Sequence, residues 1–356
     1  MREQNAVRYS NIELFRCICM LFIILGHFTI ECGIEEFSEI NKIFNFFGYW
    51  GGAAGNIGFI CISAWWLDRF RFSGEKIGRI MWKTTLYSIA LWILAAVVFH
   101  QTFGIEKLLR SFLPIFYGGY EYITIFVIVY FMSPMLKKIL SKMEQKTQQK
   151  LIVVSGILLM VIPLIFLGSP RFTNYFTTFV FLYIVLDYLK KYEQKRIQDK
   201  IFLIKVSVFS WGAMIGYAII ILVLKNYIPY LQPYSSMWAS GTGIVMMLAM
   251  GSLFFLFLNW KIPYSKIINW IGGCTLGIFL LHAAPATRNF IWIELFHTDT
   301  WGMSKLFPLK MLGCCVLMYV ICLLIESILR LIAGKIPTLG NGVIRKLDNW
   351  MHELEE

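Results

Sequence analysis

Charged side chains are scarce in this sequence: Asp, Glu, Lys and Arg account for 15% of its 356 residues, whereas 58% are hydrophobic. In a water-soluble domain roughly a quarter of the residues are charged. Between residues 12 and 332 the sequence also lacks a polar stretch long enough to fold by itself. These shortages exclude a soluble protein and predict a single membrane domain over residues 1–356, with a short cytoplasmic tail at 333–356.

Signals of metal, disulfide and nucleic-acid chemistry are missing too. The eight cysteines contain no CxxC pair and no ligand-like spacing to a histidine. Nearly all of them lie inside apolar segments, so we expect core thiols, with no disulfide framework and no metal. The net charge of +12 is typical of nucleic-acid binding, but the basic residues lie in short loops between apolar segments, where membrane topology explains them. No nucleic-acid partner is expected.

Long apolar runs, by contrast, are abundant. A helix that crosses the hydrocarbon core needs about 20 mostly apolar residues. Ten segments approach that length: 12–30, 44–67, 84–100, 119–136, 151–168, 172–189, 201–224, 237–258, 267–284 and 309–332. The sequence therefore predicts an all-α fold, a polytopic integral membrane helical bundle of about ten transmembrane helices in contact with membrane lipid. Assembly into a homo-oligomer stays open.

Basic residues alternate between the loops. Of the 33 Lys and Arg residues, 22 fall in the N-terminus, in every second gap and in the C-terminal tail, and 7 fall in the opposite gaps. Basic loops remain in the cytoplasm. We therefore expect a multi-pass protein of the plasma (inner) membrane with both termini in the cytoplasm.

The first apolar segment contains three ionisable side chains, Glu13, Arg16 and His27. Such groups are costly at membrane depth and usually face the bundle interior or an aqueous cavity. His27 follows Arg16 by eleven positions, which places both within about 20 degrees of one helix face and roughly 16 Å apart along the axis. The alternative is a snorkelling Glu13–Arg16 pair at the interface and a histidine that packs between helices.

Two carboxylates lie at helical spacing from these groups. Glu13 precedes Arg16 by three residues, where it can hold the guanidinium in one rotamer. Glu31 follows His27 by four residues, where it can orient the imidazole or raise its basicity.

The segment Asn-Ile-Glu-Leu-Phe-Arg at 11–16, followed by Leu-Gly-His at 25–27, resembles the opening of the membrane-bound acyltransferase-3 family, whose hallmark is R-x10-H in the first span. Later stretches agree. Residues 55–63 resemble an apolar strip that ends in Ser-Gly in the family, with Ala64 in place of Gly. The aromatic region 120–134 resembles its fourth span, which closes in Ser-Pro. Residues 275–282 resemble its late Gly-Ile-Tyr-Leu-x-His stretch, with Phe279 in place of Tyr.

Members of this family transfer acyl groups, commonly acetyl, from cytoplasmic acyl-coenzyme A to hydroxyls of surface carbohydrates. The resemblance implies a membrane O-acetyltransferase with acetyl-CoA (or another acyl-CoA) as donor substrate, no tightly bound cofactor, and a cell-surface polysaccharide or lipid-linked glycan as acceptor. By the same resemblance His27 is the catalytic residue and Arg16 its partner, with Glu13 beside it.

Acyl transfer from a thioester to a hydroxyl needs a general base, a place for the developing oxyanion and alignment of the two reactants. His27 suits the role of base, and a covalent acyl-histidine is the alternative. His282, near the outer end of the ninth segment, is expected to bind the acceptor or act as a base, or else to pack between helices.

The phosphates of coenzyme A would be drawn to Arg16 and to the basic stretch between residues 69 and 83. Within this stretch Arg69 and Arg79 are the candidates for donor contact, with plain membrane topology as the alternative explanation of each. Ser63 can hydrogen-bond near the acyl group or bond its own helix backbone.

The competing interpretation is a membrane transporter or flippase of glycans or small molecules, which would also place Arg and His in a polar cavity. Paired repeats with broken helices favour transport, and the sequence shows no such pair. A purely structural membrane subunit would not need three ionisable groups on one span.

Overall fold

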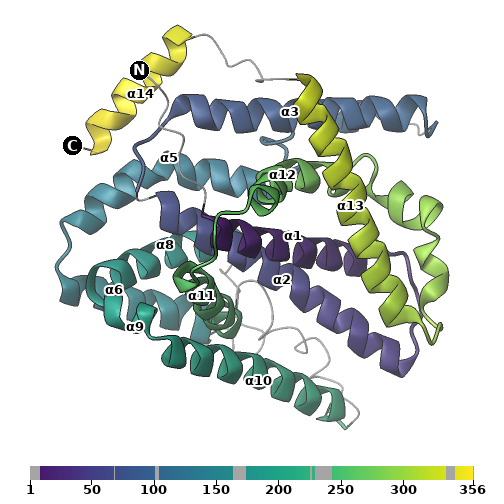
Figure 1. The fold of residues 1–356 in the computed structure, drawn as a ribbon, viewed down its shortest axis with the longest axis horizontal. Coiled ribbons are helices and arrows are strands. Elements are labelled where there is room, and N and C mark those ends of the chain that lie inside the picture. Colours follow the sequence, from purple (N-terminus) through teal and green to yellow (C-terminus); the bar gives the residue numbers. More distant parts are fainter. Residues whose placement is uncertain are drawn as a thin grey trace.

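The computed structural model describes residues 9–67, 69–100, 104–162, 174–224, 227–228, 243–333 and 341–355. Within these ranges the chain is helical and has no β-strand, which confirms the all-α class (Figure 1). The longer helices are α1 (Ser10–Glu31), α2 (Glu39–Leu67), α3 (Gly74–Val97), α5 (Glu121–Ser141), α6 (Gln145–Gly156), α8 (Tyr175–Tyr192), α10 (Lys200–Leu224), α11 (Ile244–Asn259), α12 (Lys266–His282), α13 (Phe307–Ala333) and α14 (Asn341–Glu355). The shorter ones are α4 (Ile105–Phe112), α9 (Gln194–Gln198), the π-helices η1 (Ile157–Val161) and η3 (Phe290–Leu295), and the 3₁₀-helix η4 (Thr298–Trp301).

Five of the described helices are long and apolar enough to cross a membrane: α1, α3, α5, α13 and the Lys200–Ile220 part of α10. The apolar helices α11 and α12 are shorter, at 16 and 17 residues. These helices are those of a membrane protein, while the count of about ten spans stays a prediction. The ends of three predicted segments, at 163–168, 172–173 and 237–242, lie outside the described residues.

The predicted segment 84–100 is wrong at its start, because α3 begins ten residues earlier, at Gly74. The side chain of Ser73 accepts a hydrogen bond from the backbone N–H of Lys76 and so caps the helix. The predicted segment was bounded by charged side chains, because it was defined as a run of apolar residues. A capped helix can include charged side chains when these form ion pairs or hydrogen bonds. Lys83, predicted in a loop, therefore lies within α3.

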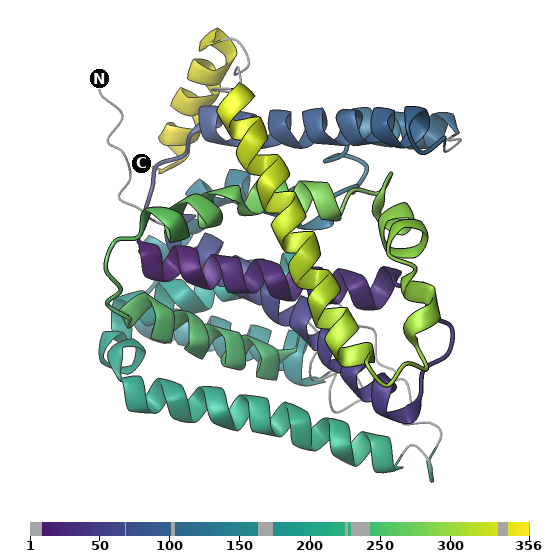
Figure 2. The same cartoon turned by 45° about the vertical axis from the view of Figure 1, so that its right-hand side comes forward.

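Helix α1 runs through the centre of the bundle, next to α2, α11, α12 and α13. No proline or glycine interrupts it before Gly26, and about half of its residues are buried. A Cβ atom at Gly26 would overlap the backbone of Gly52 in α2, so the absence of side chains lets these two helices touch. On another side, α13 crosses α1 obliquely (Figure 2).

Helix α12 approaches its neighbours closely at two glycines. A Cβ atom at Gly272 would overlap the carboxylate of Glu13 on α1, and one at Gly277 would overlap the carboxylate of Glu326 on α13. Both positions therefore need glycine. Two buried carboxylates thus lie directly against the backbone of α12.

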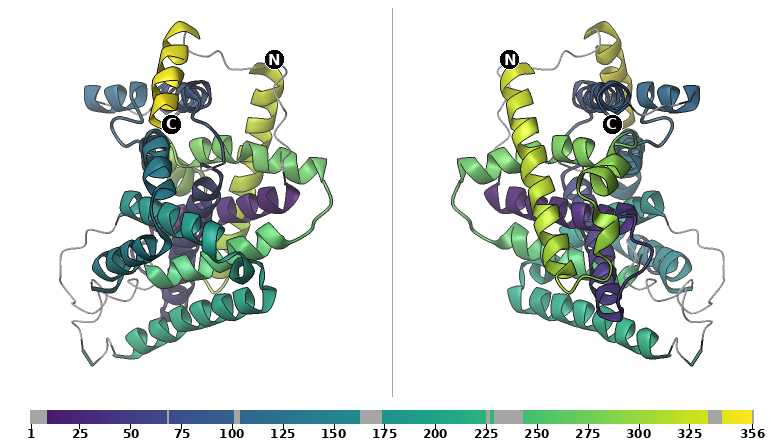
Figure 3. Two further views of the ribbon diagram at one scale, coloured as in Figure 1. Left: turned by 90° about the vertical axis from the view of Figure 1, so that its left-hand side faces the viewer. Right: turned by 90° about the vertical axis from the view of Figure 1, so that its right-hand side faces the viewer.

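The C-terminal helix α14 packs against α3 and α5 (Figure 3). Asp348 accepts a hydrogen bond from the backbone N–H of Gly74 at 2.6 Å, and the imidazole Nε2 of His352 donates to the carbonyl of Phe72 at 3.0 Å. Between these two residues Met351 is buried. Residues 341–355 of the tail thus hold the connection between α2 and α3.

Candidate active site

Arg16 is held in place by a buried carboxylate. Its Nη1 atom lies 3.1 Å from each carboxylate oxygen of Glu13, one turn earlier on α1. The Glu13 side chain is only 7% exposed and lies against Gly272, so it has little room to turn away. The spacing in the sequence predicts this pair, and the structure adds α12 as its support.

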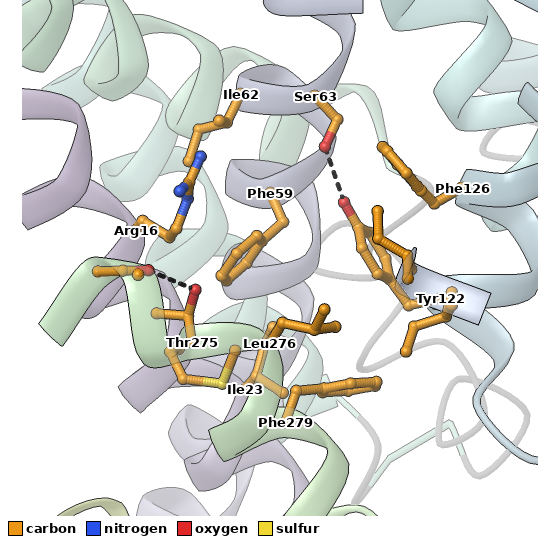
Figure 4. Close-up of a pocket in the computed structure, with 15 residues that line it drawn as sticks. Arg16, Ile23, Phe59, Ile62, Ser63, Tyr122, Phe126, Thr275, Leu276 and Phe279 are labelled. Carbon is orange, nitrogen blue, oxygen red and sulfur yellow. Dashed lines mark hydrogen bonds between the residues drawn. The ribbon is translucent and has the colours of Figure 1, made fainter. Parts of the chain in front are cut away.

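Arg16 faces a cavity of about 210 Å³ that is mainly apolar; we call it the apolar cavity. It is lined by Arg16, Met20 and Ile23 of α1, Phe59, Ile62 and Ser63 of α2, Ile80 of α3, Tyr122, Ile123 and Phe126 of α5, and Gly272, Gly273, Thr275, Leu276 and Phe279 of α12. Figure 4 shows Arg16 on one side of the cavity and the hydroxyls of Ser63 and Tyr122 on the other. These two hydroxyl oxygens are 3.2 Å apart, so Ser63 pairs across helices.

A second cavity of about 200 Å³, the basic cavity, adjoins the first at Arg16. The two share Arg16, Ile62, Ser63 and Phe126 in their walls. The remaining wall of the basic cavity comes mostly from the end of α2 and the α2–α3 connection. Arg71 of this connection and Lys76 in the first turn of α3 add positive charge. A flexible anionic ligand would find its charges matched in the basic cavity and its apolar portion matched in the apolar cavity.

Beyond the apolar cavity, α1 and α12 bring two histidines together. The ring centroids of His27 and His282 are 5.0 Å apart. His282 is 1% exposed, and its Nδ1 lies 2.7 Å from the carbonyl oxygen of Ile278. Since a carbonyl only accepts, Nδ1 carries the proton and Nε2 keeps its lone pair. Among the described residues Nε2 has no hydrogen-bond partner, so a buried basic nitrogen remains available beside His27.

Phe279 separates the histidines from the apolar cavity. Its ring lines that cavity, and its centroid lies 6.2 Å from that of His27 and 5.9 Å from that of His282. A ligand that enters past Arg16 therefore meets this ring before it meets an imidazole.

The other candidates from the sequence, Glu31, Arg69 and Arg79, do not line either of these two cavities. Glu31 forms an ion pair with Arg288 at 3.2 Å, on the far side of the histidines from Arg16. Arg69 lies over the rings of Trp65 and Trp66, and Arg79 pairs with Glu75 at 2.6 Å. Neither arginine lines the apolar or the basic cavity.

Sequence reasoning selected the basic stretch after α2 but not its members that reach the cavity, Arg71 and Lys76. It gave no role to Tyr122, because nothing in the sequence pairs that residue with Ser63. The sequence did not reveal Arg288 either: it lies between α12 and η3, and the fold brings it to Glu31 of α1.

A second buried ionic cluster was missed completely. Glu326 of α13 is fully buried and lies 2.6 Å from Lys83 and 3.1 Å from Arg330, and it accepts a hydrogen bond from the hydroxyl of Tyr87. Lys83 and Tyr87 belong to α3. The cluster therefore ties α3 to α13 around α12.

Comparison with known proteins gives one family. Residues 9–327, which include every candidate named above, match the family model described as an acyltransferase domain. No curated protein and no solved structure matched the sequence. Helix α14 begins after the matched range.

Proposed function

The chain belongs to the acyltransferase-3 family and is a membrane acyltransferase; from this premise we propose that it transfers an acetyl group from acetyl-CoA to a hydroxyl of a cell-surface polysaccharide or lipid-linked glycan. The observation that carries the proposal is the order of features along α1: the basic cavity, Arg16, the apolar cavity and then the histidine pair. An acyl-coenzyme A has its parts in the same order: the charged phosphates, the pantetheine arm and the thioester.

The donor would lie with its phosphates in the basic cavity. Arg71, Lys76 and Arg16 supply the positive charge there, and guanidinium groups bind phosphate through paired hydrogen bonds. The pantetheine arm would then extend through the apolar cavity, where its methylene groups replace contact with water. The thioester would arrive at Phe279, next to His27.

The reaction needs one acyl transfer and the movement of one proton from the acceptor hydroxyl to the departing sulfur. His27 would take the proton of the acceptor hydroxyl as its oxygen attacks the thioester carbonyl carbon. The new C–O bond forms, the C–S bond breaks, and the proton passes to the departing sulfur, which leaves coenzyme A as a free thiol. Ser63 and Tyr122 share one hydrogen bond, and the hydroxyl proton that this bond leaves free would be donated to the carbonyl oxygen. The Nε2 atom of His282 would accept a hydrogen bond from the protonated His27.

The proposed orientation follows from the donor. Acyl-coenzyme A is cytoplasmic, so we place the Arg16 end of α1 and both termini in the cytoplasm and the Glu31 end outside, in the plasma (inner) membrane. The excess of Lys and Arg in the N-terminus, alternate loops and C-terminal tail supports the same orientation.

Transfer of isotopically labelled acetyl from acetyl-CoA to extracted cell-surface glycan tests the proposal. Membranes would carry the wild-type chain, His27→Ala, or no protein. We expect label with the wild type only, because a positioned base contributes about 10² to 10⁴-fold in rate. The control is His100→Asn, which removes an exposed histidine at a position of positive φ that Asn tolerates.

Normal transfer by His27→Ala would rule out the catalytic role of this residue. Equal label in all three membranes, with the protein present and glycan supplied, would rule out the enzyme. Label retained on the wild-type chain after the glycan is withheld, and absent from His27→Ala, would identify a covalent acyl-histidine in place of direct transfer.

A further inference from the structure

A third cavity lies on the other side of the histidine pair from Arg16. Its volume is about 340 Å³, near the lower end of the range of about 300 to 1,000 Å³ found for small-molecule sites. The walls come from α3, the end of α4, the turn before α5, and the segment that follows α12. We call it the polar cavity.

Two contacts and one neighbouring position in the sequence place the polar cavity next to the histidines. Tyr120, in its wall, donates a hydrogen bond to the carbonyl of Leu280 at 3.1 Å, and its ring lies 6.0 Å from that of Phe279. Ala284, also in the wall, follows His282 by two residues. The cavity is therefore built directly onto the turn of α12 that carries His282.

Arg288 provides the link to α1. It lines the polar cavity and pairs with Glu31 at 3.2 Å. Since Glu31 lies four residues after His27, about one helical turn, the guanidinium is held beyond His27 along the same helix face. A molecule bound to Arg288 in this cavity would have its nearest atoms close to the histidine pair.

The lining of this cavity differs in chemistry from that of the apolar cavity. Two guanidinium groups, Arg110 and Arg288, face it together with Ser88, Ser111, Asn289 and the ring of Trp92. Hydroxyl and amide groups beside an aromatic ring suit a sugar, whose hydroxyls need hydrogen-bond partners and whose C–H face packs on an indole.

The two arginines specify the charge of the ligand. Each pairs with a glutamate that does not line the cavity, Arg110 with Glu106 at 2.7 Å and Arg288 with Glu31. The arginine side chains are 54% and 44% exposed, so these are surface ion pairs of about 0 to 1 kcal/mol each. A guanidinium has five N–H donors, and the pairs leave several of them for a ligand.

We propose that the polar cavity binds the acceptor and that this acceptor is an acidic saccharide, whose carboxylate or phosphate contacts Arg110 and Arg288 while a neighbouring hydroxyl reaches the histidine pair. The inference rests on the proposed function for the chemistry of transfer, but the binding itself does not require it. The acyl donor and the acceptor would then approach His27 from opposite ends of α1, and their reacting atoms would meet beside Phe279.

Binding of labelled oligosaccharides to the purified full-length protein tests the inference. The probes are an oligosaccharide that contains a uronic acid, the same oligosaccharide with its carboxyl group reduced to an alcohol, a glycosyl phosphate, and inorganic phosphate alone. The variants are Arg110→Gln and Arg288→Gln. The matched control is Lys42→Gln, which removes one cation from an exposed ion pair with Glu39 that lies outside the cavity.

We expect the wild type and Lys42→Gln to bind an acidic probe at least about tenfold more tightly than the reduced one, and each arginine variant to lose this preference. Preference for the uronic acid or for the glycosyl phosphate identifies the anion. Equal binding of acidic and reduced probes, a preference that survives in both arginine variants, or binding of inorganic phosphate as tight as that of the saccharides would overturn the inference.

The same proteins are then assayed for acetyl transfer. Saccharide binding that depends on Arg110 and Arg288 without any transfer would retain the site and reject the proposed reaction. Transfer to neutral acceptors that is unaffected by either arginine variant would retain the reaction and reject the site.

Discussion

The C-terminal helix offers the sharpest test of where the donor binds. Asp348 of α14 accepts a hydrogen bond from the N–H of Gly74, the first residue of α3. That N–H has no partner within its own helix, and a carboxylate at a helix N-terminus also interacts favourably with the helix dipole. The connection that precedes Gly74 supplies Phe70, Arg71 and Phe72 to the basic cavity. We predict that Asp348→Ala weakens donor binding from a distance.

The size of the effect follows from the contact that is lost. A hydrogen bond to a charged group contributes about 1.5 to 3 kcal/mol, and His352 and the buried Met351 still hold α14 after the change. Only part of this lost free energy should weaken donor binding in the basic cavity. Because about 1.4 kcal/mol corresponds to a tenfold change in affinity, we expect the KM for acetyl-CoA to rise by about threefold to tenfold, with kcat little changed.

Steady-state transfer measured against acetyl-CoA concentration gives both constants, and hydrogen exchange of the 69–76 amides reports whether the connection has loosened. Asp348→Asn should largely restore KM, because its side-chain oxygen still accepts the bond. Glu353→Ala removes an exposed acid from the same helix and should change neither readout. Faster exchange at 69–76 with an unchanged KM in Asp348→Ala would show that the basic cavity is not the donor site.

Two further predictions concern residues to which the sequence gave no role in the site. Phe279→Leu should raise the ratio of butyryl to acetyl transfer by several-fold, because a smaller side chain extends the apolar cavity toward His27. Phe279→Tyr, which keeps the ring, is the control. An unchanged ratio in Phe279→Leu would contradict the prediction that the Phe279 ring separates the apolar cavity from the histidines. Glu326→Gln should lower the thermal stability of the purified protein, since breaking a buried ion pair costs about 3 to 5 kcal/mol, whereas Lys83→Met combined with Glu326→Gln should recover much of it. A double variant as unstable as the single one would contradict this pairing.

The parts of the site that lie on one helix could be predicted from the sequence. The spacing of Arg16 and His27 gives their common face, and the spacing of Glu13 gives its ion pair with Arg16, because helix geometry fixes all three relations. The composition gives the all-α class for a similar reason, since in lipid the backbone must satisfy its own hydrogen bonds.

Contacts between helices could not be predicted in this way. His282 lies 255 residues after His27, and no periodicity states that α12 packs beside α1. Ser63 had two partners open to it in the sequence, an acyl group or its own backbone, and the structure instead pairs it with Tyr122. Lys83 was placed in a loop because it is charged, although Glu326 removes the cost of burying it.

The position of His282 beside His27 depends on the contacts that α12 makes with its neighbouring helices. This helix carries Phe279 and His282, and its backbone touches Glu13 at Gly272 and Glu326 at Gly277. Glu13 in turn fixes Arg16, and Glu326 fixes Lys83 of α3. Each carboxylate can stay buried only while its cation is in place. The ion pair on α1 and the ion pair between α3 and α13 therefore both lie against α12, the helix that holds His282 beside His27.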